Sequence, residues 1–498
     1  MHLELHIPAA AKRVVVPATL AFALAACAAG PNFKPPPPPD VSGYTTRPLA
    51  TTAATPGAAA GGAQNFEQGA DIPGDWWALF HSQPLDALIE QALRNNHDLK
   101  AAQAALRAAH ESVLAQRGTF FPNVSAGFTA SREHDPSAAL APVPSNNAFL
   151  YSLFTPQLTI GYTPDLFGLN RRTLESMKSQ EQAARFQMIA AWTTLTSNVV
   201  VTVVQEASLR EQVRATRELV DLEKHSLDIL RLRFRKGDAS RLDVAAQQTQ
   251  LAQTEASLPP LVKQLAATQH ALAVLVGAFP DQAPAESLTL ADLQLPESLP
   301  VSLPSRLVAQ RPDVRQARAN LHAASAAIGI AAAQRLPQIQ LTADVGSTAL
   351  AISKVFTSGT GFWGIAASLT APIFQGGQLM HQERAAKAAY VEAAEQYRGT
   401  VLAAFQNVAD TLVALDQDAS GLQAAAKAEQ AAKTTLDLSR LQLKHGYIGT
   451  FELLAAQQAY QQARIALVQA EANRFADTAA LYQALGGGWW HHSEMARQ

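Results

Sequence analysis

The sequence predicts a mixed membrane protein, in which each chain supplies four strands to a β-barrel and long helices to a coiled-coil barrel. Three observations lead to this fold class. Four segments alternate apolar and polar residues, two long segments have a helical period without proline, and the whole pattern occurs twice. Alternation with period 2 is typical of strands with one apolar face, whereas apolar residues three and four positions apart indicate helices.

The first 26 residues are typical of a secretory signal peptide. The basic pair Lys12-Arg13 precedes an apolar stretch, Val14–Ala23, and such a signal has these two parts in this order. The stretch leads into Leu24–Cys27, which resembles a bacterial lipobox, and Cys27 is the only cysteine of the chain. We therefore expect a covalent lipid on Cys27 and, because Ala28 follows it, sorting to the outer membrane. The alternative is an unmodified cysteine beside an ordinary cleavage site.

Residues 27–84 are predicted to be a lipid-anchored N-terminal segment rather than a domain. Residues 28–70 are rich in Pro, Ala, Gly and Thr and include the run Pro35–Pro39. Polyproline II needs no internal hydrogen bonds and behaves as a stiff spacer. We expect this segment to be extended or poorly ordered.

The rest of the chain repeats one pattern. Asp98 precedes Pro122 by 24 positions (122−98), and Asp313 precedes Pro337 by the same distance (337−313). Two further landmarks recur with offsets of 207 and 209, and a nearly constant offset indicates tandem duplication. The predicted division is a signal peptide (1–26), the N-terminal segment (27–84), a first repeat (85–285), a second repeat (286–490) and a C-terminal tail (491–498).

The four alternating segments predict strands that are long enough to cross a membrane. In the first, Val124 and Phe128 share one parity, and Ser125 and Thr129 share the other. A tilted strand of about 9–11 residues crosses a bilayer. The residues that define the four strands lie within 122–132, 157–162, 338–345 and 363–370.

A very long helix is predicted after each pair of strands. The segment Leu169–Lys236 has 68 residues and no proline, so a helix over it would be roughly 100 Å long. A matching segment lies between Phe374 and Gly446, with apolar residues at intervals of three and four. The return segment of the first repeat contains Pro259-Pro260, which must either start a new helix or kink the existing one.

A glycine is predicted to end each long helix. Cations precede both Gly237 and Gly446, and cations followed by a C′ glycine favour a helix C-terminus. Ser240, with Asp243 three residues later, predicts the N-cap of the first return helix. Each repeat should therefore contain a strand, an external loop, a second strand, a long helix, a tight turn and a return helix.

The four strands must be completed by other copies of the chain. The smallest membrane barrels have eight strands, and unpaired strand edges cannot face lipid, because each free N–H or C=O group there costs several kcal/mol. Two, three or four chains would give 8, 12 or 16 strands. The same symmetry would place the long helices in a tube, and a tube needs no active site.

Five motifs form a specific set: Gly30–Lys34, Trp76-Trp77, Ser305–Asp313, Pro372–Gly377 and Ala484–Trp489. As a set they resemble the outer-membrane factor family, the TolC/OprM/NodT-type lipoprotein exit ducts of tripartite, RND-type efflux systems. The resemblance covers about residues 27–490. It implies a homotrimer with a twelve-stranded barrel that passively conducts substrates from an inner-membrane pump and a periplasmic adaptor to the exterior.

The resemblance also implies a docking site for the adaptor at the two helical tips. The candidate docking residues are Gly237, Asp238, Gly446, Tyr447 and Gly449. No cofactor is expected apart from the covalent lipid on Cys27.

Two charged pairs near the tips are candidates for a periplasmic gate. Asp228 and Arg231 precede the first tip, and Asp437 and Arg440 occupy the same place, 209 residues later, before the second. Residues at i and i+3 share a helix face, and ducts of this family close through charged contacts between tip helices. The alternative interpretation is a solvated pair within one helix that contributes little to stability.

The composition argues against other classes of protein. The 39 Lys+Arg and 41 Asp+Glu residues give a net charge of −2, whereas a nucleic-acid-binding protein normally has a basic excess.

The sequence shows no catalytic constellation and no metal-ligand spacing, so we expect neither an enzyme nor a metal site. Gly359–Gly364 matches G-x-G-x-x-G but lacks the flanking strand and helix of a nucleotide site. A structural envelope lipoprotein and the exit duct of a type I secretion system are the alternatives.

Overall fold

The computed structural model describes residues 28–41, 43–45, 49–134, 150–282, 288–492 and 495. The predicted signal peptide, Cys27 and part of the predicted tail (493–494 and 496–498) lie outside the described residues. The chain forms two compact units, each of which combines segments from both halves of the sequence. Unit 1 consists of Met1–Pro36, Leu106–Ala183 and Ala317–Tyr397, and unit 2 of Pro37–Ala105, Ala184–Gln316 and Arg398–Gln498.

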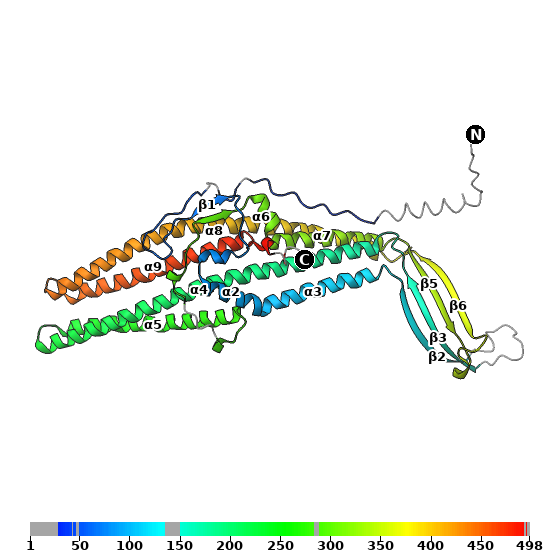
Figure 1. The fold of residues 1–498 in the computed structure, drawn as a ribbon, viewed down its shortest axis with the longest axis horizontal. Coiled ribbons are helices and arrows are strands. Elements are labelled where there is room, and N and C mark those ends of the chain that lie inside the picture. The colour runs from blue at the N-terminus through cyan, green and yellow to red at the C-terminus, as the bar shows by residue number, and fades with distance from the viewer. Residues whose placement is uncertain are drawn as a thin grey trace, which may run out of the picture. The chain divides into compact units, whose positions relative to one another are not determined.

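Unit 1 contains a four-stranded antiparallel sheet with the strand order β2-β3-β5-β6 (Figure 1). The strands are β2 (Asn123–His134), β3 (Leu150–Tyr162), β5 (Gln338–Ser347) and β6 (Gly361–Thr370). Each of the four alternating segments thus forms a strand, as its alternation predicts.

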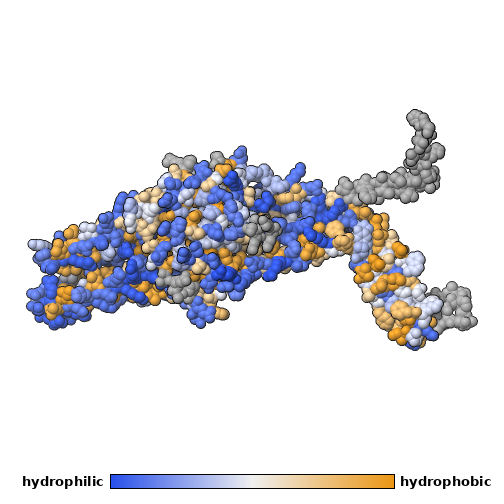
Figure 2. Space-filling model, in the orientation of Figure 1, coloured by the Kyte–Doolittle hydropathy of each residue, from blue (hydrophilic) through white to orange (hydrophobic). Residues whose placement is uncertain are grey.

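The strand register aligns apolar residues across the whole sheet. One apolar row consists of Val124, Ile160, Ala343 and Ile365. The next consists of Ala126, Leu158, Val345 and Trp363. Between these rows the side chains are polar, and Thr159 Oγ1 donates a hydrogen bond to Asp344 Oδ1 at 2.6 Å. One face of the sheet is therefore apolar, and Figure 2 shows apolar residues gathered over the strands.

The first long helix has the predicted bounds, and the second lies within the segment predicted for it, between Phe374 and Gly446. They are α4 (Leu169–Lys236) and α8 (Gln378–Lys444), and they are followed by the return helices α5 (Arg241–Leu275) and α9 (Thr450–Ala484). The other α-helices among the described residues are α2 (Gln83–Asn95), α3 (His97–Gly118), α6 (Pro304–Gln310) and α7 (Pro312–Ala333). Short 3₁₀ helices are η1 (Trp76–Phe80), η2 (Pro280–Gln282), η3 (Leu290–Asp292), η4 (Ile352–Lys354) and η5 (Trp489–His491).

The helix α5 continues through Pro259 and Pro260. Of the two predicted alternatives, a new helix at this point is therefore wrong. Both prolines and the preceding residues Glu255 and Ala256 are exposed. Water can therefore solvate the carbonyl groups that the prolines leave without an N–H partner, so the helix is not forced to end.

The core of unit 2 is an aromatic cluster between η1 and α9. The Trp76 and Tyr482 rings are stacked with their centroids 5.1 Å apart, and Phe80 packs on Phe475 at 6.1 Å. All four side chains are fully buried. The helix α4 contains a stretch that is long and apolar enough to span a membrane. Of this stretch, 61 % is buried inside the chain, as in the core helix of a soluble domain.

A two-stranded parallel sheet in unit 2 was not predicted. Its strands are β1 (Asn65–Gln68) and β4 (Ser298–Val301), with Phe66 opposite Leu299. The strand β1 belongs to the N-terminal segment, which was expected only to be extended or poorly ordered. The segment from 49 to 64 is irregular but packed, because Thr52, Ala60 and Gln64 are buried. We call residues 49–64 the N-terminal strap.

Candidate functional site at the helical tips

The tips of the two hairpins α4/α5 and α8/α9 belong to unit 2 and lie at the same end of it (Figure 1). At the first tip, the Gly237 N–H donates to the Phe234 carbonyl at 3.0 Å and the Asp238 N–H to the Arg233 carbonyl at 2.9 Å. These two bonds satisfy carbonyl groups that the helix end would otherwise leave free, in the pattern of a Schellman motif.

The second tip has the same hydrogen-bond pattern. The Gly446 N–H donates to the Leu443 carbonyl at 3.1 Å, and the Tyr447 N–H donates to the Gln442 carbonyl at 2.9 Å. The backbone φ angle is +85° at Gly237 and +75° at Gly446. A Cβ at either position would meet no atom within 4 Å, so glycine is required there for its left-handed backbone and not for space.

The return helices begin differently at the two tips. Ser240 caps α5 as predicted: the Asp243 N–H donates to Ser240 Oγ at 3.1 Å, and the Ser240 N–H donates to the Asp243 carboxylate at 2.9 Å. Hydrogen bonds from Ser240 lower the pKa of Asp243. Gly449 occupies the corresponding N-cap of α9, where no side chain caps the helix.

Both tips expose large side chains. They are Phe234 and Leu242 at the first tip, and Tyr447 and Phe451 at the second. Tyr447 is 80 % exposed. Below the second tip, Leu436 and Leu453 are buried between α8 and α9, with Tyr460 packed against them. The hairpin is therefore held together below its tip, while the tip itself offers apolar surface.

The candidate gate residues form two equivalent ion pairs. Arg231 lies 3.4 Å from Asp228 on α4, and Arg440 lies 3.4 Å from Asp437 on α8. All four side chains are at least 41 % exposed in the single chain. Each pair therefore lies within one helix and is solvated, and its participation in a gate stays a prediction.

Arg440 also lines a cavity of about 240 Å³ between α4, α8 and α9. Across this cavity, Arg464 of α9 lies 2.8 Å from Glu211 of α4. Burial opposes ionisation of Glu211, but hydrogen bonds from Arg214 and Arg464 outweigh it and lower the pKa of this carboxyl. The second hairpin is thus joined to α4 by a charged contact close to one candidate gate residue.

The outer membrane efflux protein family matches this chain over residues 88–278 and 303–487, which is more than half of its length. The chain belongs to this family. The pyoverdine export outer membrane protein OpmQ of Pseudomonas aeruginosa is 31% identical over 422 residues, covering 83% of this chain and 87% of OpmQ. The probable efflux pump outer membrane protein TtgC of Pseudomonas putida is 30% identical over 488 residues, covering 97% of this chain and 96% of TtgC.

Solved structures of outer-membrane channels have the same fold. The outer-membrane channel OprN superimposes with a TM-score of 0.81 at 25% identity, covering 93% of this chain and all of OprN. The CmeC outer membrane channel of Campylobacter jejuni superimposes with a TM-score of 0.83 at 21% identity, covering 95% of this chain. The names of these relatives describe outer membrane channels and export proteins, not enzymes.

One buried contact of this efflux protein has no signal in the amino-acid sequence. Arg474 of α9 is fully buried and forms hydrogen bonds with the N-terminal strap. Its guanidinium donates to the Ala60 carbonyl at 2.5 Å, to Thr52 Oγ1 at 3.1 Å and to Gln64 Oε1 at 3.0 Å. In the sequence, a single arginine within a helical segment cannot be distinguished from a cation on the helix surface. Its partners precede it by more than 400 residues, so no local pattern indicates the contact.

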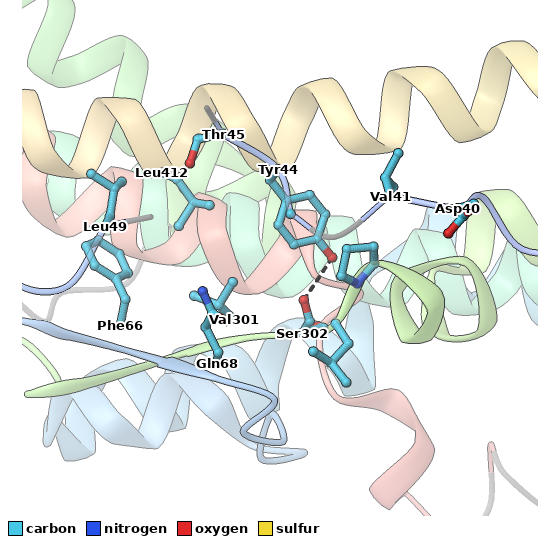
Figure 3. A pocket seen from close by; sticks show the side chains of 13 residues that line it. Asp40, Val41, Tyr44, Thr45, Leu49, Phe66, Gln68, Val301, Ser302 and Leu412 are labelled. Carbon is cyan, nitrogen blue, oxygen red and sulfur yellow. Dashed lines mark hydrogen bonds between the residues drawn. The ribbon is translucent and has the colours of Figure 1, made fainter. Parts of the chain in front are cut away.

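A second cavity, of about 630 Å³, lies where the N-terminal segment crosses β4 and α8 (Figure 3). Tyr44 Oη donates to the Ser302 carbonyl at 2.9 Å in this cavity, and the ring packs on Phe405. Burial raises the pKa of Tyr44 above its usual range. Phe66 and Leu412 supply apolar lining, so the cavity is part of the attachment of the N-terminal segment and has no catalytic constellation.

Proposed function

We propose that this efflux protein is the outer-membrane exit duct of a tripartite pump, passively conducting substrates from an RND-type inner-membrane pump and a periplasmic adaptor to the exterior. The observation that carries the proposal is the sheet in unit 1. Its apolar face is continuous across four strands, and the outer edges of β2 and β6 pair with no other strand among the described residues. Such a sheet requires both lipid and further strands.

A homotrimer would complete the sheet as a barrel of twelve strands, with β6 of each copy beside β2 of the next. Closure removes every free edge, which lipid does not tolerate. The tandem organisation supports the same picture, because residues 85–285 and 286–490 each supply two strands of this sheet and a pair of long helices. Three copies would then surround the duct with six similar helical hairpins.

A lipid on Cys27 would provide a second attachment to the outer membrane. The chain just after Cys27 is fixed to the start of α4, close in sequence to the end of β3: the Ala29 N–H donates to the Phe167 carbonyl at 2.9 Å. Arg172 donates to the Ala29 carbonyl at 3.0 Å and to Asn32 Oδ1 at 2.9 Å. These contacts favour a lipid held near the membrane end of unit 1. Cys27→Ser should abolish incorporation of labelled palmitate, and retained label would contradict this assignment.

The adaptor would dock at the tips formed around Gly237, Asp238, Gly446, Tyr447 and Gly449. Apolar side chains exposed at both tips support docking, since exposed apolar groups gain by burial against a partner. At rest the tips would converge, and the Asp437–Arg440 and Asp228–Arg231 pairs would then meet their symmetry mates. Opposite charges attract more strongly in a narrow, partly desolvated ring than in bulk water, so these pairs could hold the resting duct closed.

Cysteine cross-linking tests barrel closure directly. Ser125→Cys on β2 would be combined in turn with Gly364→Cys, Ala366→Cys and Ser368→Cys on β6, and cells would be treated with a short bismaleimide. We expect at least one pair to give covalently closed trimers, because β2 and β6 become neighbours only between copies.

The matched control combines Ser125→Cys with Thr342→Cys on the interior strand β5, and it should give no cross-linked trimer. Covalent dimers or tetramers as the end point would contradict the twelve-stranded barrel. Monomers from every β2–β6 pair would contradict closure between copies.

A further inference from the structure

The two hairpin tips differ in charge although they share one backbone. In the sixteen residues 228–243, five Lys and Arg against three Asp give a formal charge of +2. In the equivalent residues 437–452, two Lys and Arg against two Asp and Glu give zero. A trimer would therefore present +6 on its first tips and no net charge on its second tips.

The cations of the first tip are exposed and available to a partner. The last turn of α4 contains Arg233, Arg235 and Lys236, whereas the last turn of α8 contains only Lys444 as a basic residue. Arg233, Arg235, Lys236 and Arg241 are all exposed. Within the described part of the chain they form no ion pair. Figure 2 shows hydrophilic residues gathered at the end of the α4/α5 hairpin.

The helix does not need these charges for its own stability. Cations near a helix C-terminus interact favourably with the helix dipole, but α8 ends in the same Schellman turn with Gln442 and His445 where α4 has Arg233 and Lys236. Furthermore, Arg231 and Arg235 are four positions apart, and like charges at this spacing destabilise a helix. The excess charge therefore points to a function outside the chain.

We infer that the α4/α5 tip, and not the α8/α9 tip, binds an acidic segment of the periplasmic partner. This inference rests on the proposed function, in which an adaptor docks at the tips. The partner segment should be a helical turn that carries several Asp or Glu side chains beside apolar residues, because exposed Phe234 and Leu242 flank the cations. Complementary charge would fix which part of the partner meets which tip.

Photo-cross-linking in cells tests this inference. A photoreactive phenylalanine would replace Ala239 in the first turn or Ile448, its equivalent 209 residues later, in the second, and captured peptides would be identified by mass spectrometry. We expect the peptide captured at 239 to contain several Asp or Glu, and that captured at 448 to lack this excess.

The matched variants exchange residues between the tips. Arg233→Gln with Arg241→Thr gives the first tip the residues of the second, and should lower the cross-link yield at 239 at least fivefold while leaving 448 nearly unchanged. Gln442→Arg with Thr450→Arg is the control for added charge and should not lower the yield at 239. An unchanged yield at 239, or a neutral or basic peptide there, would overturn the inference while leaving docking intact. No periplasmic partner at either tip would contradict docking itself and the inference with it.

Discussion

The sheet of unit 1 and the helical core of unit 2 use the same kinds of side chain in opposite ways. In unit 2, Trp76 and Phe475 are completely buried within the chain. In the sheet, Trp363 is 77 % exposed and Ile365 is 79 % exposed. The helical core is thus complete in one chain, whereas no part of the chain that the structure describes covers Trp363 and Ile365 on the apolar face of the sheet.

This difference indicates that the two parts of the protein face different surroundings: lipid around the sheet of unit 1, and water around the helices of unit 2. Contiguous apolar surface of this extent is rare on soluble monomers and marks a membrane or protein contact. The sheet also has free edges, which the helices do not, because helices satisfy their backbone hydrogen bonds internally. Substitutions in the sheet should therefore act on insertion and assembly, and substitutions in the helical core should follow the rules of soluble proteins.

The largest effect is expected from a charge on the apolar face of the sheet. Ile365→Arg places a cation in the middle of an apolar row, where lipid would surround it at a cost of about 2–4 kcal/mol in each copy. We expect loss of most heat-resistant trimer from the outer membrane fraction, measured by electrophoresis of unheated samples. Ser368→Arg on the other face of β6 is the control and should assemble; equal loss in both variants would remove the distinction between the two faces.

The second effect concerns the buried attachment of the N-terminal strap. Arg474→Ala leaves the Ala60 carbonyl, Thr52 and Gln64 without their buried donor and creates a cavity. Buried polar groups without partners cost about 1–3 kcal/mol each, so the protein should melt at a clearly lower temperature. Rapid proteolytic cleavage within residues 49–64 should accompany this loss.

Arg464→Ala on the same helix is the matched control, because Arg464 is partly exposed and pairs with Glu211. It should change the melting temperature much less and leave the strap protected. A strap that stays protected in Arg474→Ala would show that the contact does not hold it.

A third effect depends on pH. Burial and a hydrogen bond with Asp418 raise the pKa of Asp477 to about 7. Its pKa in the unfolded chain is near 3.8, so the native state binds the proton more tightly, and Asp477 destabilises the fold increasingly as the pH rises from about 4 to about 7. Asp477→Asn should therefore raise the melting temperature at pH 8 and change it much less at pH 5.

Asp416→Asn removes a carboxylate from α8 outside this pair and serves as the control for the pH experiment. It should shift melting by the same amount at both pH values. A stabilisation by Asp477→Asn that is equal at pH 5 and pH 8 would contradict a shared proton between Asp418 and Asp477.

The smallest effect is expected at the start of α9. Gly449→Ser would give this helix the capping residue that Ser240 supplies to α5, and serine exceeds glycine at an N-cap by only a few tenths of a kcal/mol. We expect a small gain in the free energy of unfolding of the helical core, measured with denaturant. Ser240→Gly should give a loss of similar size, and a change of the same sign in both variants would contradict the equivalence of the two caps.

Local patterns predicted much of the fold. Alternation located all four strands of the sheet, and the combination of a proline-free segment with a terminal glycine gave α4 its observed bounds, Leu169–Lys236. The turn residues Gly237 and Gly446 and the cap at Ser240 were also predictable, because each is determined by a few neighbouring residues.

Contacts between distant segments could not be predicted in the same way. The pairing of β1 with β4 joins short segments more than 200 residues apart, and strands of four residues have too little alternation to detect. The burial of Arg474 depends on the path of the N-terminal strap, which no periodicity encodes. For the gate, the sequence placed the Asp437–Arg440 pair on one helix face, but the partners of this pair across a symmetry axis depend on the assembled protein.

Single-channel recording of the purified protein in planar lipid bilayers tests directly whether it forms a transmembrane duct. We expect discrete conductance steps, and larger steps for Asp437→Ala, because Arg440 would then repel its symmetry mates and widen the periplasmic end. Trimer that migrates intact on an unheated gel but produces no conductance steps, in the wild type and in Asp437→Ala alike, would contradict a transmembrane duct.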